Sequence, residues 1–143
     1  MNRAELLVFL RRHRLCVQAS VADSGAPQAA VVGYGVSDDL ELVFDTVGTT
    51  RKMTNLRRDP RIALVIGWDQ ETVQIDGIAD EPRDAELARM KAVYFDAYPD
   101  GKDRERWEGI TYVRVRPTWI RYSDFRSAEP KIVEIGEQAL RGS

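Results

Sequence analysis

The sequence predicts a mainly β protein, a six- to seven-stranded antiparallel β-barrel with two or three peripheral helices. Three observations support this class. Short stretches with strand character follow one another with tight turns between them, such as DSGAP at residues 23–27. Residues 40–46 and 71–80 alternate apolar with polar side chains, as half-buried strands do. Consecutive antiparallel strands close most readily into a small barrel, which removes exposed edges.

The composition is that of one globular domain over residues 1–143, with 5–135 as its structured core and 136–143 as a loose tail. Hydrophobic residues make up 43% of the chain and charged residues 31%, ordinary proportions for a globular protein. The formal net charge of −2 creates no overall field toward nucleic acid or anionic lipid.

Targeting and redox signals are weak. No apolar stretch approaches the roughly 20 residues of a membrane span, and the apolar stretch near the N-terminus is too short for a signal peptide. Cys16 is the only cysteine, so no internal disulfide can form. We therefore expect a soluble, cytoplasmic protein with no membrane and no nucleic-acid partner.

The first part of the chain predicts a helix followed by a meander. Asn2 and Glu5 have the spacing of a capping box, and the leucines after them share one helical face. This short helix ends in the basic sequence RRHR at residues 11–14. Three strand candidates separated by turns follow, at residues 15–22, 28–36 and 40–46.

The second part predicts two helices among further strands. TTRKMTNLRRDP at residues 49–60 supplies a helix that ends before its Asp-Pro pair, because the residue before proline avoids the helical region. An amphipathic helix is expected at 83–98. Pro117 interrupts the alternating segment 110–125, so we expect that strand to be bent or to lie at an edge. The other strand candidates are residues 62–66, 71–80 and 131–135.

Hydroxyls and cations meet in TTRK, residues 49–52, at the start of a predicted helix. The first amides of a helix lack partners and carry partial positive charge, which favours an anion. Thr50 would add a donor, Arg51 can grip two oxygens, and Lys52 supplies a point charge. Without an anion, these cations oppose the helix dipole. The alternative interpretation is a threonine N-cap followed by solvated basic residues.

Motifs around this cluster resemble those of the flavin mononucleotide (FMN) split-barrel family, which includes pyridoxamine 5'-phosphate oxidase and general stress protein 26. The family pattern is aromatic-X-Thr at a strand end, Ser/Thr-Arg-Lys, then Asn-Leu and Asn/Asp-Pro before an apolar strand. The corresponding residues are FDT at 44–46, TRK at 50–52, NL at 55–56 and DP at 59–60. WIRYSDF, starting at Trp119, is similar to the C-terminal strand of many small members, and the resemblance covers about residues 5–135.

The resemblance implies an FMN-binding split barrel that forms a homodimer with flavin at the subunit interface. Arg51 and Lys52 would bind the flavin phosphate, with Thr46 and Thr50 near it. Asp45 lies beside this site, where we expect an exposed aspartate at a strand end. The remaining positions implied are the backbone around Val31, Val32 and Gly33 along the isoalloxazine ring, Gln74 or alternatively Thr72 as a polar contact, and Trp119, which covers the ring or serves as a core or interface aromatic.

The function favoured by the resemblance is an FMN-dependent oxidoreductase acting on an unidentified small molecule. In such an enzyme the cofactor carries out the redox chemistry, and the sequence offers no clear catalytic acid or base. True pyridoxamine-phosphate oxidases carry Arg-X-His near the C-terminus, whereas the only histidine here is His13. Oxidation of a vitamin precursor is therefore not expected. A flavin-binding module without turnover and a deazaflavin-dependent reductase stay open as alternatives.

Metal and haem sites have little support in the sequence. One histidine and one cysteine cannot form a cluster with ligand spacing. His13 lies in a basic segment that we expect at the surface, where it would be solvated, and Cys16 is expected to be a small buried hydrophobe. No metal is therefore expected.

Overall fold

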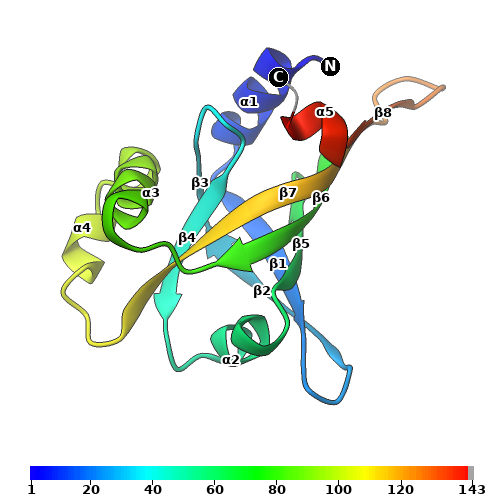
Figure 1. Cartoon of the computed structure of the whole chain (residues 1–143). Helices are drawn as coiled ribbons and strands as arrows, with labels where there is room; N and C mark the ends of the chain where they lie inside the picture. The colour runs from blue at the N-terminus through cyan, green and yellow to red at the C-terminus, as the bar shows by residue number, and fades with distance from the viewer. Residues whose placement is uncertain (142–143) are drawn as a thin grey trace.

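The computed structural model describes residues 1–141 as one antiparallel sheet with helices around it (Figure 1). The strands of this part of the chain are β1 (Leu15–Val21), β2 (Pro27–Gly33), β3 (Gly35–Val36), β4 (Leu42–Val47), β5 (Arg61–Ile66), β6 (Glu71–Asp80), β7 (Ile110–Asp124) and β8 (Lys131–Gly136). Its helices are α1 (Arg3–Arg12), α2 (Arg51–Arg58), α3 (Asp84–Ala97), α4 (Gly101–Arg104) and α5 (Glu137–Arg141). None of these helices is long and apolar enough to cross a membrane.

The sheet forms a split barrel, as the sequence predicted. Its strands follow the order β2-β1-β5-β6-β7-β4-β3, and each neighbouring pair is antiparallel. β2 and β3 occupy the two ends of this order, although only Tyr34 separates them in the chain. No strand ladder joins these two ends within the described sheet, so the barrel stays open along that seam.

The counts of elements exceed the prediction. The expected second strand is divided into β2 and β3, which gives eight strands in the described chain where six or seven were predicted. Helices α4 and α5 were not predicted, so two or three expected helices become five. Both additional helices are short, four and five residues, and such lengths leave no periodic pattern in a sequence.

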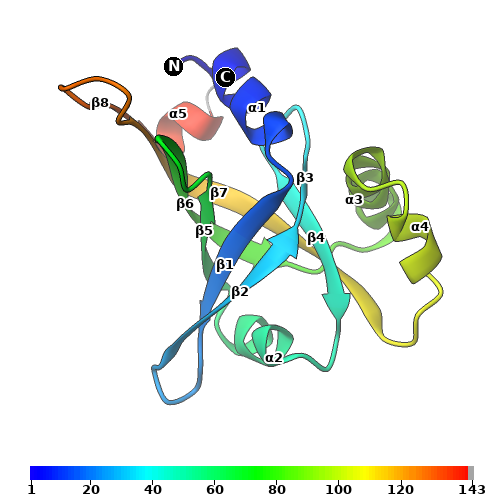
Figure 2. The ribbon, with the colours of Figure 1, turned by 180° about the vertical axis from the view of Figure 1, so that it is seen from behind.

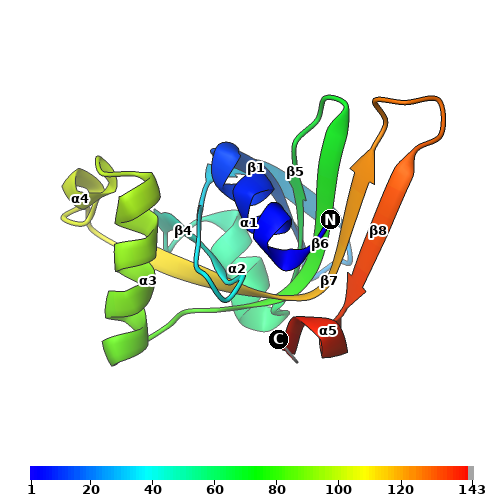
Figure 3. The same ribbon diagram turned by 90° about the horizontal axis from the view of Figure 1, so that it is seen from above.

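Strand β7 was expected to be bent or to lie at an edge; it is central, so the second of these alternatives was wrong. β7 pairs with β6, β4 and β8. The irregularity expected at Pro117 is present as a bulge: Asp76 pairs with Trp119 but Gly77 pairs with Pro117, which leaves Thr118 as an extra residue. Because a bulge interrupts the ladder locally, it accommodates a residue that lacks an N–H. β8 pairs only with β7, and Figure 3 shows this hairpin standing away from α3 and α4.

Two helices cover opposite ends of the barrel (Figures 1 and 2). α1 buries Leu6, Phe9 and Leu10 in the main core, and the predicted capping box at its start is confirmed. α2 covers the other end and buries Met53 and Leu56. The main core is the cluster of buried apolar side chains inside the barrel, and it includes Cys16 as expected. Burial raises the pKa of that thiol to about 12.

Helix α3 packs on the outside of β3 and β4 and forms a second, smaller core with Val43, Met90, Tyr94 and Tyr112. The amphipathic helix expected at residues 83–98 is confirmed, and it buries Met90 and Tyr94. The helix is therefore held by an apolar stripe on the outer face of the sheet rather than by the barrel interior.

A network of ion pairs adds to the attachment of α3. Buried Arg114 of β7 lies 2.6 Å from Asp80 of β6 and 3.0 Å from Glu86 of α3. Arg89 of α3 donates to both carboxylate oxygens of Glu41 at 2.8 Å. Hydrogen bonds from Arg89 lower the pKa of Glu41, and they lower the pKa of Glu86 to about 2.

The expected loose tail at residues 136–143 was wrong for most of its length. Gly136 ends β8, and residues 137–141 form α5. Leu140 packs against the main core from this helix. Pairing of β8 with β7 directs the chain back over the sheet, which gives the following residues a surface to pack on. Residues 142 and 143 lie outside the described part of the chain.

Acidification is expected to weaken the attachment of α3. Because the folded-state pKa values of Glu41 and Glu86 are lowered, their contribution is fully present above the ordinary carboxyl pKa of about 4.3 and is lost as the pH falls through the folded-state pKa. The free energy of unfolding should therefore fall between pH about 4.5 and pH about 2. Urea denaturation at several pH values measures this dependence.

The variant Glu86→Gln should show a smaller fall over the same pH range. Glu108→Gln is the matched control, because Glu108 is exposed and forms no ion pair or hydrogen bond within the described chain. It should keep the fall of the wild type. An equal fall in all three proteins would contradict the role given to Glu86.

Candidate functional site

The loop from β4 into α2 brings the two motif threonines together. Thr46 is buried near the end of β4, and its Oγ1 lies 3.4 Å from Oγ1 of Thr50. Thr50 occupies the N-cap position of α2, but its side chain accepts no capping hydrogen bond. The two hydroxyls therefore face one another instead of serving the helix end, which is not the arrangement of an ordinary threonine cap.

The first turn of α2 has donors without acceptors. The carbonyl of Thr50 accepts from the amides of Met53 and Thr54 at 3.1 and 3.2 Å. Within residues 1–141, the amides of Arg51 and Lys52 donate to no backbone carbonyl, and the first turn contains no acidic residue. Partial positive charge at this end is therefore not neutralised by the chain itself.

Lys52 lacks a counter-charge although it is partly buried. Among the basic side chains that the structure describes, it is the one that is partly buried and yet forms neither an ion pair nor a hydrogen bond. Other partly buried cations have partners, such as Lys91 with Glu105 at 3.1 Å. Burial lowers the pKa of the Lys52 amine because nothing nearby offsets the loss of water. The arrangement fits an anion bound at this position.

Buried Asn55 fixes the position of α2 against the barrel. Its Nδ2 donates to Ser20 Oγ at 3.1 Å and to Gln28 Oε1 at 2.8 Å, which ties the helix to β1 and β2. The sequence offered Asn55 only as part of the Asn-Leu motif and indicated no role for it. Its contacts lie 35 and 27 residues away, so no local pattern could have revealed them.

Asp45 does not join the threonine cluster. Successive strand residues point to opposite faces, so Asp45 faces α3 and α4 while Thr46 faces the barrel. Tyr94 Oη donates to Asp45 Oδ1 at 2.9 Å, and Arg104 Nε donates to Oδ2 at 2.9 Å. The side chain is 11% exposed, so the expectation of an exposed aspartate was wrong. Asp45 instead joins the strand to the helices.

The candidate ring contacts on β2 face different sides of the sheet. Val31 points outward and is 58% exposed, whereas Val32 packs against the main core. Gly33 lies directly beneath the ring of Tyr98, and a Cβ at this position would come within 2.6 Å of ring atoms. Only a residue without a side chain allows this close approach.

Gln74 and Trp119 share the outer face of the sheet with Val31. The register places Val31, Val17, Val65 and Gln74 in one row across β2, β1, β5 and β6. Trp119 pairs with Asp76, two residues along from Gln74, so both side chains point to the same side.

Thr72, the alternative to Gln74, also lies on this outer face because it is two residues before Gln74. The direction of the side chains therefore does not decide whether Gln74 or Thr72 is the polar contact to the ring. Most candidate residues thus fall into two groups: a phosphate-site group near α2 (Thr46, Thr50, Arg51 and Lys52) and a ring group on the outer face (Val31, Gln74 or Thr72, and Trp119). Val32, Gly33 and Asp45 belong to neither group.

His13 is packed rather than solvated, contrary to expectation. It is partly buried, its Nδ1 lies 2.9 Å from the carbonyl oxygen of Phe9, and the two ring centroids are 4.4 Å apart. Within residues 1–141, no group of three His, Cys, Asp or Glu residues lies close enough together to hold a metal ion.

Comparison with known families identifies this split barrel. The family model described as pyridoxamine 5'-phosphate oxidase matches residues 3–124, and the chain belongs to this family. A search among curated proteins gives no match.

Similar solved structures share the fold. The heme binding protein from Mycobacterium smegmatis has a TM-score of 0.84 at 20% identity, covering 98% of this chain and 60% of that one. General Stress Protein 26 from Bacillus anthracis has a TM-score of 0.70 at 16% identity, covering 93% and 98%. A FAD-binding protein from Mesorhizobium loti has a TM-score of 0.67 at 19% identity, covering 85% and 94%. The chain thus spans 60% of the Mycobacterium smegmatis protein, and likeness at these identities shows the fold alone.

Removing the amide of Asn55 should loosen α2. Asn55→Ala leaves Ser20 and Gln28 without their shared donor in a buried site, which should cost about 1–3 kcal/mol of unfolding free energy. Denaturant unfolding measures the change. Thr54→Ala, on the exposed side of the same helix, should change stability by less than about 0.5 kcal/mol. Equal losses in the two variants would show that Asn55 is not the tether.

Proposed function

We propose that the chain binds FMN with its phosphate at the start of α2 and acts as an FMN-dependent oxidoreductase on an unidentified small molecule. The observation that carries the proposal is Lys52, a partly buried cation without a partner. A phosphate would supply the missing counter-charge and accept hydrogen bonds from the free amides of Arg51 and Lys52. Family membership and a structural relative named as FAD-binding favour a flavin as the molecule that carries this phosphate.

The donor set fits a phosphate ester. Two hydroxyls, two amides, a guanidinium and an ammonium group are available, and the one nearby carboxylate, Asp45, faces the opposite side of β4. Bound flavin supplies hydride or electron transfer. Residues of the chain hold and orient it, so no side chain at this cluster needs to act as an acid or base.

The ring group points to a homodimer, which we propose as the active assembly with flavin at the subunit interface. Helices leave the outer face of β2, β1 and β5 uncovered, as Figure 2 shows. Val31 and Val65 are exposed there, together with the smaller Ala29 and Ala63. Because the phosphate and ring groups lie apart in one chain, a second subunit against this face would complete the site. Cys16, a free buried thiol, supports a reducing cytoplasmic compartment.

Two alternatives share the same phosphate site. A deazaflavin carries a phosphate that the cluster could hold equally well, and a flavin module without turnover would need no substrate. Reduction of bound FMN by NADH or NADPH, followed by turnover with an acceptor, separates an enzyme from such a module. Bound FMN that is never reduced would favour the module.

Removing the two cations should abolish tight FMN binding. Arg51→Ala with Lys52→Ala should raise the Kd for FMN about 100-fold or more, because two charge-assisted contacts to phosphate are lost. The change in the visible absorbance of FMN on binding measures the Kd. Lys102→Ala is the matched control, since Lys102 is an exposed lysine that forms no ion pair in the described chain.

A separate substitution at Lys52 gives a second readout. Lys52→Met should leave the unfolding free energy unchanged or slightly higher in the absence of FMN, because a poorly solvated charge is removed. A wild-type protein that does not alter the FMN spectrum would remove FMN as the cofactor, and deazaflavin would be titrated next.

A charge on the outer face should break the dimer. Val65→Glu places a carboxylate among exposed apolar side chains of β1 and β5, and burying it in an interface without a partner is costly. Light scattering should show a dimer for the wild type and a monomer for this variant, with weaker FMN binding. Val8→Glu, at an exposed position of α1 away from this face, should stay dimeric. A monomeric wild type would refute the assembly.

A further inference from the structure

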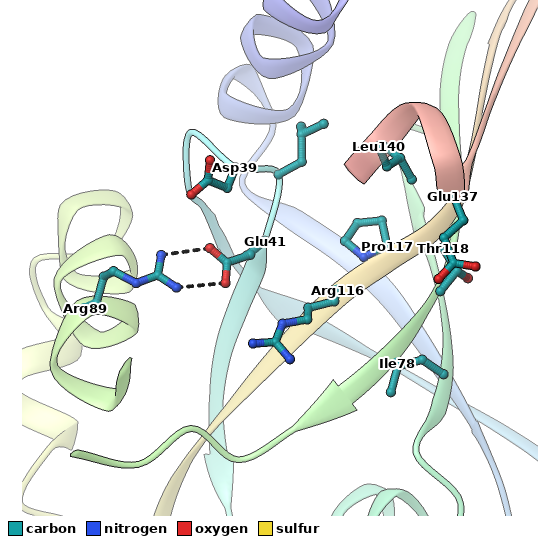
Figure 4. Close-up of a pocket in the computed structure, with 10 residues that line it drawn as sticks. Asp39, Glu41, Ile78, Arg89, Arg116, Pro117, Thr118, Glu137 and Leu140 are labelled. Carbon is teal, nitrogen blue, oxygen red and sulfur yellow. Dashed lines mark hydrogen bonds and ion pairs between the residues drawn. The ribbon is translucent and has the colours of Figure 1, made fainter. Parts of the chain in front are cut away.

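A cavity of about 480 Å³ lies on the other side of β7 from the barrel interior (Figure 4). It is bounded by the turn before β4, by α3, by the bulge of β7 and by α5. Ile78, Pro117 and Leu140 form its apolar wall. The pair of Glu41 and Arg89 forms a polar wall. Its volume falls in the range of small-molecule sites in proteins.

Arg116 reaches into this cavity, and its guanidinium donates no hydrogen bond within the described chain. Figure 4 shows its side chain extending from β7, with the Glu41–Arg89 pair on one side and Ile78 on the other. The side chain is 58% exposed, and its nearest carboxylate oxygen, on Asp80, is 3.9 Å away. That carboxylate already accepts from Arg114 at 2.6 Å. The guanidinium of Arg116 is therefore available to an oxyanion.

Arginines that line other cavities differ from Arg116. Arg14 donates to the carbonyl of Ala97 at 3.1 Å, and Arg61 donates to Asp59 at 2.6 Å. Those arginines are engaged in holding the structure together. Arg116 makes no hydrogen bond in the described chain, so its position in a cavity is not explained by structural need.

The charges around the cavity limit the kind of anion that fits. Three acids (Asp39, Glu41 and Glu137) and two arginines (Arg89 and Arg116) line it, so the net lining charge is −1. The charge of Glu41 is held by Arg89, whose hydrogen bonds lower the pKa of that carboxyl group. A dianion such as phosphate would be repelled by this net negative lining more strongly than a monoanion would. A single carboxylate needs only one guanidinium to balance its charge.

We propose that this cavity binds a small organic monocarboxylate. The carboxylate pairs with the guanidinium of Arg116, and the apolar body lies against Ile78, Pro117 and Leu140. The cavity is lined by none of the proposed phosphate-site residues Thr46, Thr50 and Lys52. The two sites are therefore separate, and binding in the cavity does not depend on flavin.

Titration of the full chain with sodium hexanoate, followed by the backbone amide NMR spectrum, tests the site. Amides around Ile78, Thr118 and Leu140 should shift saturably, while those of residues 46–52 should not. 1-Hexanol, which lacks the charge, and hexyl phosphate, which carries a second one, should each bind more weakly. Arg116→Gln should raise the Kd for hexanoate about 10-fold or more.

Two further variants keep the test independent of folding. Arg116→Lys keeps the charge but loses the paired donors, so it should bind hexanoate with an affinity between those of the wild type and Arg116→Gln. Arg106→Gln, at an exposed residue outside the cavity, should bind as the wild type does. The proposal is overturned if no saturable shift occurs at the cavity, if Arg116→Gln binds equally well, or if hexanol or hexyl phosphate binds as tightly as hexanoate.

Discussion

The pairing of strand β7 with three other strands is the constraint on which the rest of the structure depends. β6 pairs with residues 114–124 of this strand, β4 with residues 110–115 and β8 with residues 119–124. Buried Arg114 on this strand also anchors α3 through Glu86, and it pairs with Asp80 at the end of β6. On one side of β7 the partner changes from β4 to β8 across residues 116–118, the same stretch in which the bulge shifts the register with β6. The faces on which Arg116 and Trp119 lie follow from that bulge.

Charge is balanced over most of the molecule and left unbalanced at one helix end. The basic residues near the C-terminus of α2 agree with its dipole, and Arg57 there also pairs with Glu81 at 2.8 Å. At the N-terminus, Arg51 and Lys52 oppose the dipole and have no carboxylate partner in the described chain. A local conflict of this kind is expected where a ligand completes the arrangement. Buried Asn55 makes the conflict tolerable by holding the helix in place through β1 and β2.

The candidate site was predictable where its residues are neighbours in sequence. Thr50 and Lys52 lie within three positions at a helix start, and the direction of the free amides follows from helix geometry alone. The environment of Asp45 was not predictable in this way. Strand alternation places it opposite Thr46, but its partners Tyr94 and Arg104 are 49 and 59 residues away. Only the packing of α3 and α4 decides that this aspartate is a structural link.

The sequence by itself determined the elements whose causes are local: the cap at Asn2, the alternation of residues 71–80, the end of α2 before Pro60, and the cation cluster after β4. Tertiary structure alone decided that β7 is central, that the barrel stays split between β2 and β3, and that residues 137–141 form a packed helix. The reason is physical. Local spacing determines backbone preference and which residues share a face, whereas the neighbour of each face depends on hydrogen bonding and burial between segments far apart in the chain.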